Sequence, residues 1–168
     1  MIADVIPIIR KTNPQRTLMV GPGSWYSLRA LPQLTLPETD RNIIVSIHYY
    51  EPFEFTHQNA FWIAQTRDIV NRAWGTPQER SRIEADFDAA AQWARAKGRP
   101  MNLGEYGAYM KAPLDSRIAW LKAVTHAADS RGMSRNYWIF GFDQDQTDRD
   151  ALQKEWGGDA VVAALARR

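Results

Sequence analysis

The chain has 168 residues, 45% of them hydrophobic and 24% charged, which is typical of a globular domain with a hydrophobic core. The formal net charge is +2, and no run of Lys or Arg is long enough to indicate a nucleic-acid-binding surface. The chain contains no cysteine, which excludes disulfides, thiol catalysis and Cys-ligated zinc.

The N-terminal third of the chain predicts one helix and two strands. The helix spans Ala3–Lys11 and ends before Pro14. The first strand, Thr17–Val20, is a short run that ends in a Gly-Pro-Gly turn. The second, Ile43–Tyr49, is an almost continuous apolar run, as expected for a strand that is buried on both faces.

A helix with clear end signals follows. Thr76 is a capping residue, Pro77 stands at the first helical position, and Glu79 lies three residues after the cap. Apolar residues then recur at helical spacing until Gly98, where we expect the helix to stop.

The C-terminal part of the chain continues the alternation of strands and helices. Met101–Gly104 and Tyr137–Phe140 are predicted as the third and fourth strands. Between them, Asp115 is predicted to cap a helix that ends at Gly132, and a short apolar helix follows near Asp159–Ala166. Because crossovers of more than a dozen residues connect the strands, the sheet is expected to be parallel.

Two architectures with a parallel sheet remain, an open doubly wound sheet and a barrel. No G-x-G-x-x-G or G-x-x-x-x-G-K-[ST] motif follows any strand, so a nucleotide-binding fold has no support. A complete (β/α)8 TIM barrel takes about 250 residues. Four strands would therefore make half a barrel, and residues 1–168 are expected to form a single domain of this kind.

Polar and aromatic side chains stand at the C-terminal ends of the predicted strands, where parallel α/β folds build their active sites. The second strand leads into His48 and Tyr50, Glu105 follows the third strand, and Trp138 lies on the fourth. An imidazole, a phenol, a carboxylate and an indole on one rim suit the cleavage of a glycosidic bond, which needs carboxylates and a shaped cleft.

Glu105 is the main catalytic candidate, because Gly104 and Gly107 beside it let a substrate approach the carboxylate closely. The alternative is a structural glutamate that pairs with an arginine at the strand end. His48 and Tyr50 occupy alternate positions and therefore face the same side of a strand. The phenol can hydrogen-bond a carboxylate and the imidazole a sugar hydroxyl, although a buried histidine that is satisfied by the backbone is a common alternative.

Three further features allow two interpretations each. His57 lies in the loop Phe53–Gln58, which either lines a sugar subsite or is an ordered loop without a ligand role. The seven Trp indicate either a sugar-binding cleft or a Trp-rich core. The acidic stretch Asp143–Asp150 fits a solvated turn better than a cation site, and the three His have no metal-binding spacing, so no metal is expected.

Seven segments that run through essentially the whole chain carry a family resemblance: Ile9–Pro14, Val20–Pro22, His48–Phe53, Phe55–Gln58, Gly98–Pro100, Leu103–Tyr109 and Tyr137–Trp138. Together and in this order they resemble glycoside hydrolase family 5, in particular its bacterial endoglucanases. Their order matches the fifth to eighth strands of that family's barrel, which makes this chain similar to the C-terminal half.

The resemblance implies a retaining mechanism on β-1,4-glucans, with cellulose or cello-oligosaccharides as substrates and without a cofactor. It implies that Glu105 is the nucleophile and that His48 and Tyr50 lie beside it. It also implies that Trp138 stacks under the sugar at the cleavage point and that Trp25 is a further aromatic residue of the cleft.

The chain also departs from the family pattern. The family's acid/base glutamate lies in an Asn-Glu dipeptide after the fourth strand, and this chain contains neither that dipeptide nor counterparts of the first four strands. Ile139 stands where relatives commonly have Glu. A retaining enzyme needs two carboxyl groups about 5–5.5 Å apart, so we expect weak or lost hydrolysis. The alternatives are a catalytically silent carbohydrate-binding half barrel and a folding unit without activity.

Four strands of a barrel leave two open edges and an inner face that we expect to be apolar and exposed. A two-fold homodimer would close such a barrel. No apolar stretch approaches the roughly 20 residues that cross a bilayer, and Met1–Arg10 lacks the layout of a signal peptide. The resemblance implies a secreted or periplasmic protein, whereas the residues alone leave open a cytosolic protein or a start inside a longer sequence.

Overall fold

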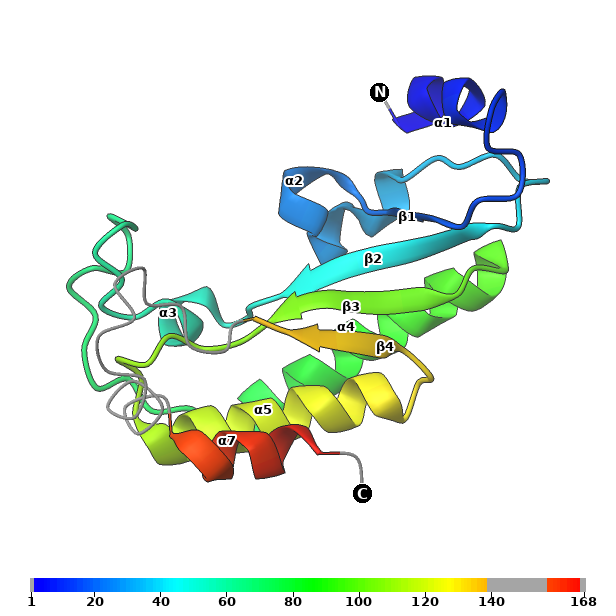
Figure 1. The fold of residues 1–168 in the computed structure, drawn as a ribbon. Helices are drawn as coiled ribbons and strands as arrows, with labels where there is room; N and C mark the ends of the chain where they lie inside the picture. Colours follow the sequence, from blue (N-terminus) through cyan, green and yellow to red (C-terminus); the bar gives the residue numbers. More distant parts are fainter. Residues whose placement is uncertain (1, 139–156, 167–168) are drawn as a thin grey trace.

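The computed structural model describes residues 2–138 and 157–166, which build a four-stranded parallel sheet with helices packed against it (Figure 1). The spatial order of the strands is also their order along the chain. A doubly wound sheet reverses direction at a switch point, whereas a barrel continues in one direction. The fold is therefore half of a (β/α)8 barrel, with four strands: β1 (Leu18–Val20), β2 (Ile43–Tyr49), β3 (Met101–Tyr106) and β4 (Ser134–Tyr137).

The helices lie mainly on one side of the sheet. In Figure 1 the strand arrowheads point to the left, toward α3 and its neighbouring loops, while α4 and α5 run along one face of the sheet. The described helices are α1 (Ile2–Arg10), α2 (Gly23–Tyr26), the 3-10 helix η1 (Leu28–Gln33), α3 (Phe53–Thr56), α4 (Pro77–Lys97), α5 (Leu114–Asp129) and α7 (Gly158–Leu165).

The end signals of α4 are confirmed, whereas the predicted cap of α5 is wrong. Thr76 Oγ1 accepts the backbone N–H of Glu79, whose side chain in turn accepts the backbone N–H of Thr76. Gly98 ends α4 in the left-handed conformation, with φ of 59°. In α5, Asp115 lies within the first turn, because the helix already begins at Leu114.

Three strands differ from the prediction in their boundaries, and β1 differs only in starting at Leu18 instead of Thr17. β3 continues to Tyr106, so Glu105 lies on the strand and not after it. β4 begins at Ser134 and ends at Tyr137, whereas Tyr137–Phe140 was predicted. The end of that predicted range, and the acidic stretch Asp143–Asp150, lie outside the described residues.

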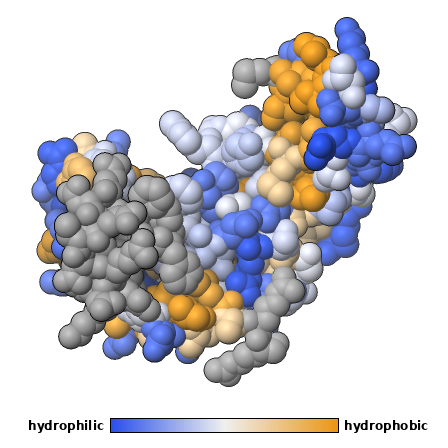
Figure 2. Space-filling model, viewed as in Figure 1, coloured by the Kyte–Doolittle hydropathy of each residue, from blue (hydrophilic) through white to orange (hydrophobic). Residues whose placement is uncertain are grey.

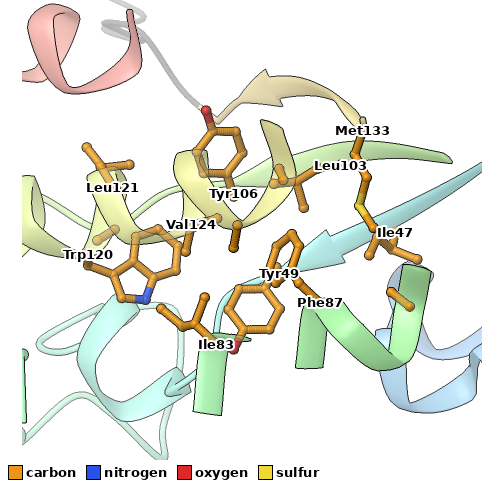
Figure 3. Packing of buried hydrophobic residues seen from close by; sticks show 14 of the residues in the cluster. Ile47, Tyr49, Ile83, Phe87, Leu103, Tyr106, Trp120, Leu121, Val124 and Met133 are labelled. Carbon is orange, nitrogen blue, oxygen red and sulfur yellow. The ribbon is translucent and has the colours of Figure 1, made fainter. Parts of the chain in front are cut away.

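One face of β2 is buried under the helices (Figure 3). Val45, Ile47 and Tyr49 are fully or almost fully shielded from water. The Tyr49 ring packs edge-on against Phe87 of α4 and parallel to Trp120 of α5, at centroid distances of 5.0 and 6.4 Å. Burial of each such side chain contributes about 1.5–3 kcal/mol. This packing fixes β2, and the alternate residues of the strand consequently face the barrel interior.

The inner face of the sheet carries a polar ladder in its middle, so the expected apolar inner face is wrong. Ser46 of β2 donates to Asn102 Oδ1 of β3 at 3.0 Å. Asn102 Nδ2 donates in turn to Ser134 Oγ and Asn136 Oδ1 of β4, both at 2.9 Å. The Ser46 and Asn102 side chains are buried. Because they satisfy each other, this ladder avoids the cost of unpaired buried polar groups.

Apolar surface gathers instead at the β1 edge of the sheet. Val5 and Ile8 of α1 are 44% and 63% exposed, and Met19 of β1 is 54% exposed. Figure 2 shows hydrophobic residues over α1 at the upper right and mainly hydrophilic colours across the centre of the same face. Within the described residues, no helix combines the length and hydrophobicity needed to cross a membrane.

Candidate active site

A cavity of about 1000 Å³ opens at the C-terminal ends of the strands. Its wall is built from β2, β3 and the segments that follow β1, β2 and β4. The structure brings together on this wall all six side chains that the sequence singled out: Trp25, His48, Tyr50, His57, Glu105 and Trp138.

A bulge in β3 aims Glu105 into the cavity. His48 of β2 lies opposite Glu105, and Gly104 is an extra residue without a partner on β2. An extra residue of this kind re-aims the side chain that follows it, and Glu105 therefore shares the inner face with His48. A Cβ atom on Gly104 would lie 2.3 Å from Ser46 Oγ, so any larger residue in the bulge would displace the Ser46 side chain.

Two side chains contact the Glu105 carboxylate. Tyr50 Oη donates a hydrogen bond to Glu105 Oε2 at 3.0 Å. His48 Nδ1 lies 3.3 Å from the same oxygen. The Glu105 side chain remains 31% exposed. The carboxylate is therefore held from one side by a phenol and an imidazole, while it stays accessible to a ligand in the cavity.

The protonation of both neighbours follows from their surroundings. Burial, followed by the charge of Glu105, raises the pKa of Tyr50, so the phenol remains a hydrogen-bond donor. Burial lowers the pKa of His48 and outweighs the opposing effect of Glu105. The neutral imidazole therefore predominates at pH 7. Since a carboxylate only accepts hydrogen bonds, the contact with Glu105 favours the tautomer with the proton on Nδ1.

His57 lines the cavity, and its hydrogen bonds determine which ring nitrogen is an acceptor. Thr56 Oγ1 lies 2.6 Å from the carbonyl oxygen of Tyr50 and 2.9 Å from His57 Nδ1. A carbonyl only accepts, so the hydroxyl proton goes to Tyr50 and the hydroxyl oxygen accepts from His57 Nδ1. Burial lowers the pKa of His57 to about 4. The ring is consequently neutral, and its Nε2 carries the free lone pair.

The ring of His57 is also held by aromatic contacts. Phe53 stacks on it with a centroid distance of 4.0 Å, and Tyr50 meets it edge-on at 5.0 Å. Tyr50 thus bonds Glu105 through its side chain and Thr56 through its carbonyl. Two separate hydrogen-bonded groups, His57 with Thr56 and the Glu105 carboxylate, are therefore both anchored on Tyr50.

Exposed indole rings form much of the cavity rim. Trp25, Trp62 and Trp138 are 90%, 54% and 52% exposed, and all three line the cavity. Trp62 packs edge-on against Tyr109 at 4.8 Å. Flat rings of this kind are suited to stacking on the apolar faces of sugars, as the sequence composition suggested for some of the seven Trp.

Sequence reasoning missed three residues of the site. Trp62 lies in a long loop without periodicity, and its one signal was an aromatic pair in an otherwise polar segment. Thr56 was hidden because its role depends on the turn of α3. Tyr26 stacks on His48 with a centroid distance of 4.8 Å, a contact that no local pattern announces.

The other carboxylates on the described part of the cavity wall are already engaged. Arg29 forms a salt bridge with Glu51 at 3.0 Å. Asp86 accepts hydrogen bonds from Tyr49 Oη and from Arg82. Within the described residues, no group of three or more His, Asp or Glu side chains is arranged to hold a metal ion.

Comparison with known proteins identifies a family. The family model for cellulase, glycosyl hydrolase family 5, matches residues 1–144. Endoglucanase H of Acetivibrio thermocellus is 32% identical over 144 residues, which cover 84% of this chain and 15% of that protein. Cellodextrinase A of Ruminococcus flavefaciens is 29% identical, with 82% of this chain and 41% of that protein covered.

Solved structures agree in fold and in extent. Thermotoga maritima Cel5A, solved in complex with cellobiose, superimposes with a TM-score of 0.87 at 32% identity, over 98% of this chain and 53% of that one. The cellulose synthase subunit Z from Clostridioides difficile gives a TM-score of 0.86 at 35% identity, over 99% and 54%.

These matches therefore cover most of this chain but only part of each relative. The chain spans about half the length of these solved relatives and a smaller share of the two curated relatives above. The half-barrel strand order, the cavity at the strand ends and the family model agree over most of the chain. The chain belongs to the cellulase family, glycosyl hydrolase family 5.

Proposed function

We propose that this chain forms a single C-terminal half-barrel domain that carries the nucleophile side of a retaining β-1,4-glucan hydrolase site. Glu105 is the nucleophile, and Tyr50 and His48 hold it. Cellulose fragments or cello-oligosaccharides lie along the aromatic rim, on Trp138 and Trp25, and His57 accepts a hydrogen bond from a sugar hydroxyl. The observation that carries the proposal is the contact of Tyr50 and His48 with one oxygen of Glu105.

The names of several relatives support this class of substrate. Endoglucanase H, Cellodextrinase A and the cellobiose complex of Cel5A all point to β-linked glucose polymers or their fragments. Uncharged aromatic walls beside a carboxylate fit such ligands, because sugars present apolar faces and many hydroxyls. The rest of the relatives' length has no counterpart here, which is why only one half of the chemistry is proposed.

The half-reaction that this chain can perform follows from its carboxylates. A Glu105 oxygen bonds to the anomeric carbon while the bond from that carbon to the leaving oxygen breaks. In a complete retaining site a second carboxyl group protonates the leaving oxygen. The Asn-Glu dipeptide that supplies it in the family is absent from this chain. Only a leaving group that departs as a stable anion should therefore react.

A single-turnover experiment tests this assignment. With 2,4-dinitrophenyl β-cellobioside, the chain should release up to one equivalent of dinitrophenolate and gain the mass of one cellobiosyl group on the peptide that contains Glu105. Glu105→Gln should do neither. Glu51→Gln, which changes another carboxylate of the cavity wall, is the matched control and should behave like the parent. Labelling that survives Glu105→Gln would remove Glu105 as the nucleophile.

The second candidate function is a catalytically silent carbohydrate-binding half barrel. The observation in its favour is the exposure of Trp25, Trp62 and Trp138 on the cavity rim, while Glu105 is the only carboxylate on the described part of the cavity wall without an arginine partner. Saturable quenching of tryptophan fluorescence by cellotetraose, without any labelling by the dinitrophenyl glycoside, would support this function. Trp138→Ala should then weaken the quenching. Labelling at Glu105 would instead support the proposed nucleophile side of a hydrolase site.

The proposal includes a two-fold homodimer. β1 and β4 are the edges of the described sheet, and an unpaired edge exposes a row of backbone donors and acceptors. The apolar side chains of α1 and β1 lie beside one of these edges. A second copy that places its β4 against β1, and its β1 against β4, closes eight strands by one symmetry operation.

A further inference from the structure

The segment after β1 contains an unusual backbone conformation. Ser24, Trp25 and Tyr26 have φ angles of 55°, 54° and 60°, which is the left-handed region. Residues other than glycine rarely occupy it, and then mostly singly and as Asn or Asp. Each such residue is strained and persists only where the surroundings enforce the conformation. Three in succession at the rim of a cavity call for a structural reason.

Backbone contacts tie this left-handed turn to His48. The N–H of Ser27 donates to the carbonyl oxygens of Gly23 and Ser24, both at 3.2 Å, which closes the turn. Ser27 then forms a parallel bridge with His48 beyond the end of β1. The chain therefore leaves the sheet after β1, makes the turn, and rejoins β2 directly beside the His48 backbone.

The turn presents the Tyr26 ring to the imidazole of His48. The two rings stack with a centroid distance of 4.8 Å and an angle of 16° between their planes. The ring also fills the space over Gly21, where a Cβ atom would lie 1.9 Å from Tyr26 Cδ1. Gly21 thus makes room for the Tyr26 ring. The bridge between Ser27 and His48 fixes the position of the turn along β2.

The imidazole is confined by few other contacts. Gly104 of β3 approaches it, since a Cβ there would lie 3.4 Å from His48 Cδ2. Its Nδ1 faces Glu105 at 3.3 Å, and Tyr50 bonds the same carboxylate oxygen. With Tyr26, these are the titratable groups that face His48 within the described residues, and Glu105 is the charged one among them. A single Nδ1 contact does not fix the plane of a ring, whereas a stacked neighbour does.

We propose that Tyr26 is a positioning residue, which holds the His48 imidazole in the plane that directs Nδ1–H at the Glu105 carboxylate. Its ring, and not its hydroxyl, performs this role, because the contact with His48 is face to face. The strained turn is the structural means of bringing that ring into place. The positioning of His48 by Tyr26 does not depend on the proposed function. Only its effect on the reaction of Glu105 rests on that function, because Glu105 loses a neighbour when the His48 ring turns away.

The test compares Tyr26→Asn with Tyr26→Phe in the full chain. Asn tolerates the left-handed conformation and so removes the ring without adding backbone strain. Phe keeps the ring and removes the hydroxyl. Phe53→Leu is the matched control, because it removes the ring that stacks on the other histidine of the cavity, His57. Circular dichroism and amide NMR spectra establish that each variant is folded.

The readout is the ¹⁵N NMR spectrum of the His48 ring as a function of pH, recorded without substrate. In the parent and in Tyr26→Phe, the neutral ring should carry its proton on Nδ1. In Tyr26→Asn both tautomers should appear and the titration should move to higher pH, because relief of burial outweighs the weaker contact with Glu105. Phe53→Leu should change the His57 signals and leave those of His48 in place.

Two results would overturn the proposal. One is a folded Tyr26→Asn variant with the tautomer and titration of the parent; the other is an equal change in Tyr26→Phe. Failure of the proposed function looks different, since the parent would then leave the dinitrophenyl glycoside uncleaved while the NMR result stands. If both hold, Tyr26→Asn should also slow labelling of Glu105 and Tyr26→Phe should not.

Discussion

At the scale of single residues, the site is organised around Tyr50. Its hydroxyl bonds Glu105, its carbonyl accepts the Thr56 hydroxyl, and its ring meets His57 edge-on. The bond from Thr56 determines which nitrogen of His57 carries the proton. One tyrosine therefore connects the proposed nucleophile to a hydrogen-bond acceptor on the cavity wall, and burial keeps that acceptor neutral.

The neutral state of His57 predicts a loss of stability in acid. Burial lowers its pKa to about 4 in the folded chain, against about 6.5 when unfolded. Between these values the unfolded chain binds more protons, so the free energy of unfolding falls as the pH falls. The expected loss is roughly 1–2 kcal/mol, less than the full shift implies because the ring is partly open to water.

Urea unfolding at pH 7 and pH 4.5 checks this prediction. His57→Asn is the matched variant, because its amide can donate to Thr56 in place of Nδ1 and does not titrate. Acidification should cost the parent more stability than it costs His57→Asn. The contributions of all other titratable groups are the same in both proteins and cancel in that difference. Equal losses in both proteins would show that His57 is not buried in its neutral form.

The roles of single residues were predictable only where the strand period shows them. The alternation of His48 and Tyr50 placed both side chains on one face, and both line the cavity. Glu105 reaches the same face through a bulge at Gly104, and a two-residue period cannot reveal one extra residue. The contacts of Tyr26 and Thr56 depend on turns that bring distant backbone together, so no local pattern predicts them.

At the scale of elements, the two faces of the sheet differ in polarity, and the inner face is the polar one. Its outer face is apolar and packs on α4 and α5, while the middle of its inner face is the ladder of Ser46, Asn102, Ser134 and Asn136. That ladder explains why β4 was predicted too late in the chain. The apolar run Tyr137–Phe140 predicts a strand there, whereas the observed strand alternates polar inner residues with others such as Arg135, which pairs with Asp129.

The polar ladder predicts a strong effect of one substitution. Asn102 accepts from Ser46 and donates to both Ser134 and Asn136, and it is buried. Asn102→Leu should remove all three bonds and leave polar atoms without partners, at a cost of about 1–3 kcal/mol or more. Asn136→Ala, at the exposed end of the ladder, is the control and should cost less than about 1 kcal/mol.

Chemical unfolding in urea measures both effects. Since neither residue lines the cavity, labelling by the dinitrophenyl glycoside should persist in whatever fraction of each variant remains folded. Equal small losses for Asn102→Leu and Asn136→Ala would mean that water already satisfies the inner face. The prediction would then fail, because the ladder would contribute little to holding β2, β3 and β4 in register.

At the scale of the whole molecule, the parallel sheet with its helices was predictable from the alternation of elements, and the family resemblance favoured the half barrel over a doubly wound sheet. The completion of the barrel was not predictable, because it depends on surfaces that only the folded chain presents. The edge strand β1 is short and carries Met19 at 54% exposure, beside the exposed Val5 and Ile8 of α1. An apolar edge of this kind favours pairing with another strand.

The proposed homodimer therefore predicts the effect of a charge on that edge. Met19→Lys should weaken self-association at least about tenfold, because a Lys on an edge strand opposes strand pairing and would be buried in a closed barrel. It should barely affect the stability of the isolated chain, in which Met19 is already exposed. Lys122→Glu, an exposed charge change on α5 that lies on the helical layer, is the control and should leave association unchanged.

Sedimentation velocity over a range of chain concentrations measures all three proteins. The parent should sediment as a dimer at concentrations where Met19→Lys is monomeric, with Lys122→Glu like the parent. A parent that stays monomeric throughout would contradict closure by a second copy.

The edge of β1 and the apolar surface of α1 would then be available to another partner. Four strands in a separate or preceding segment would meet the same geometric requirement. Addition of such a segment should then restore a closed barrel, and hydrolysis of an unactivated glucan should return only if it brings a second carboxylate within about 5–5.5 Å of Glu105.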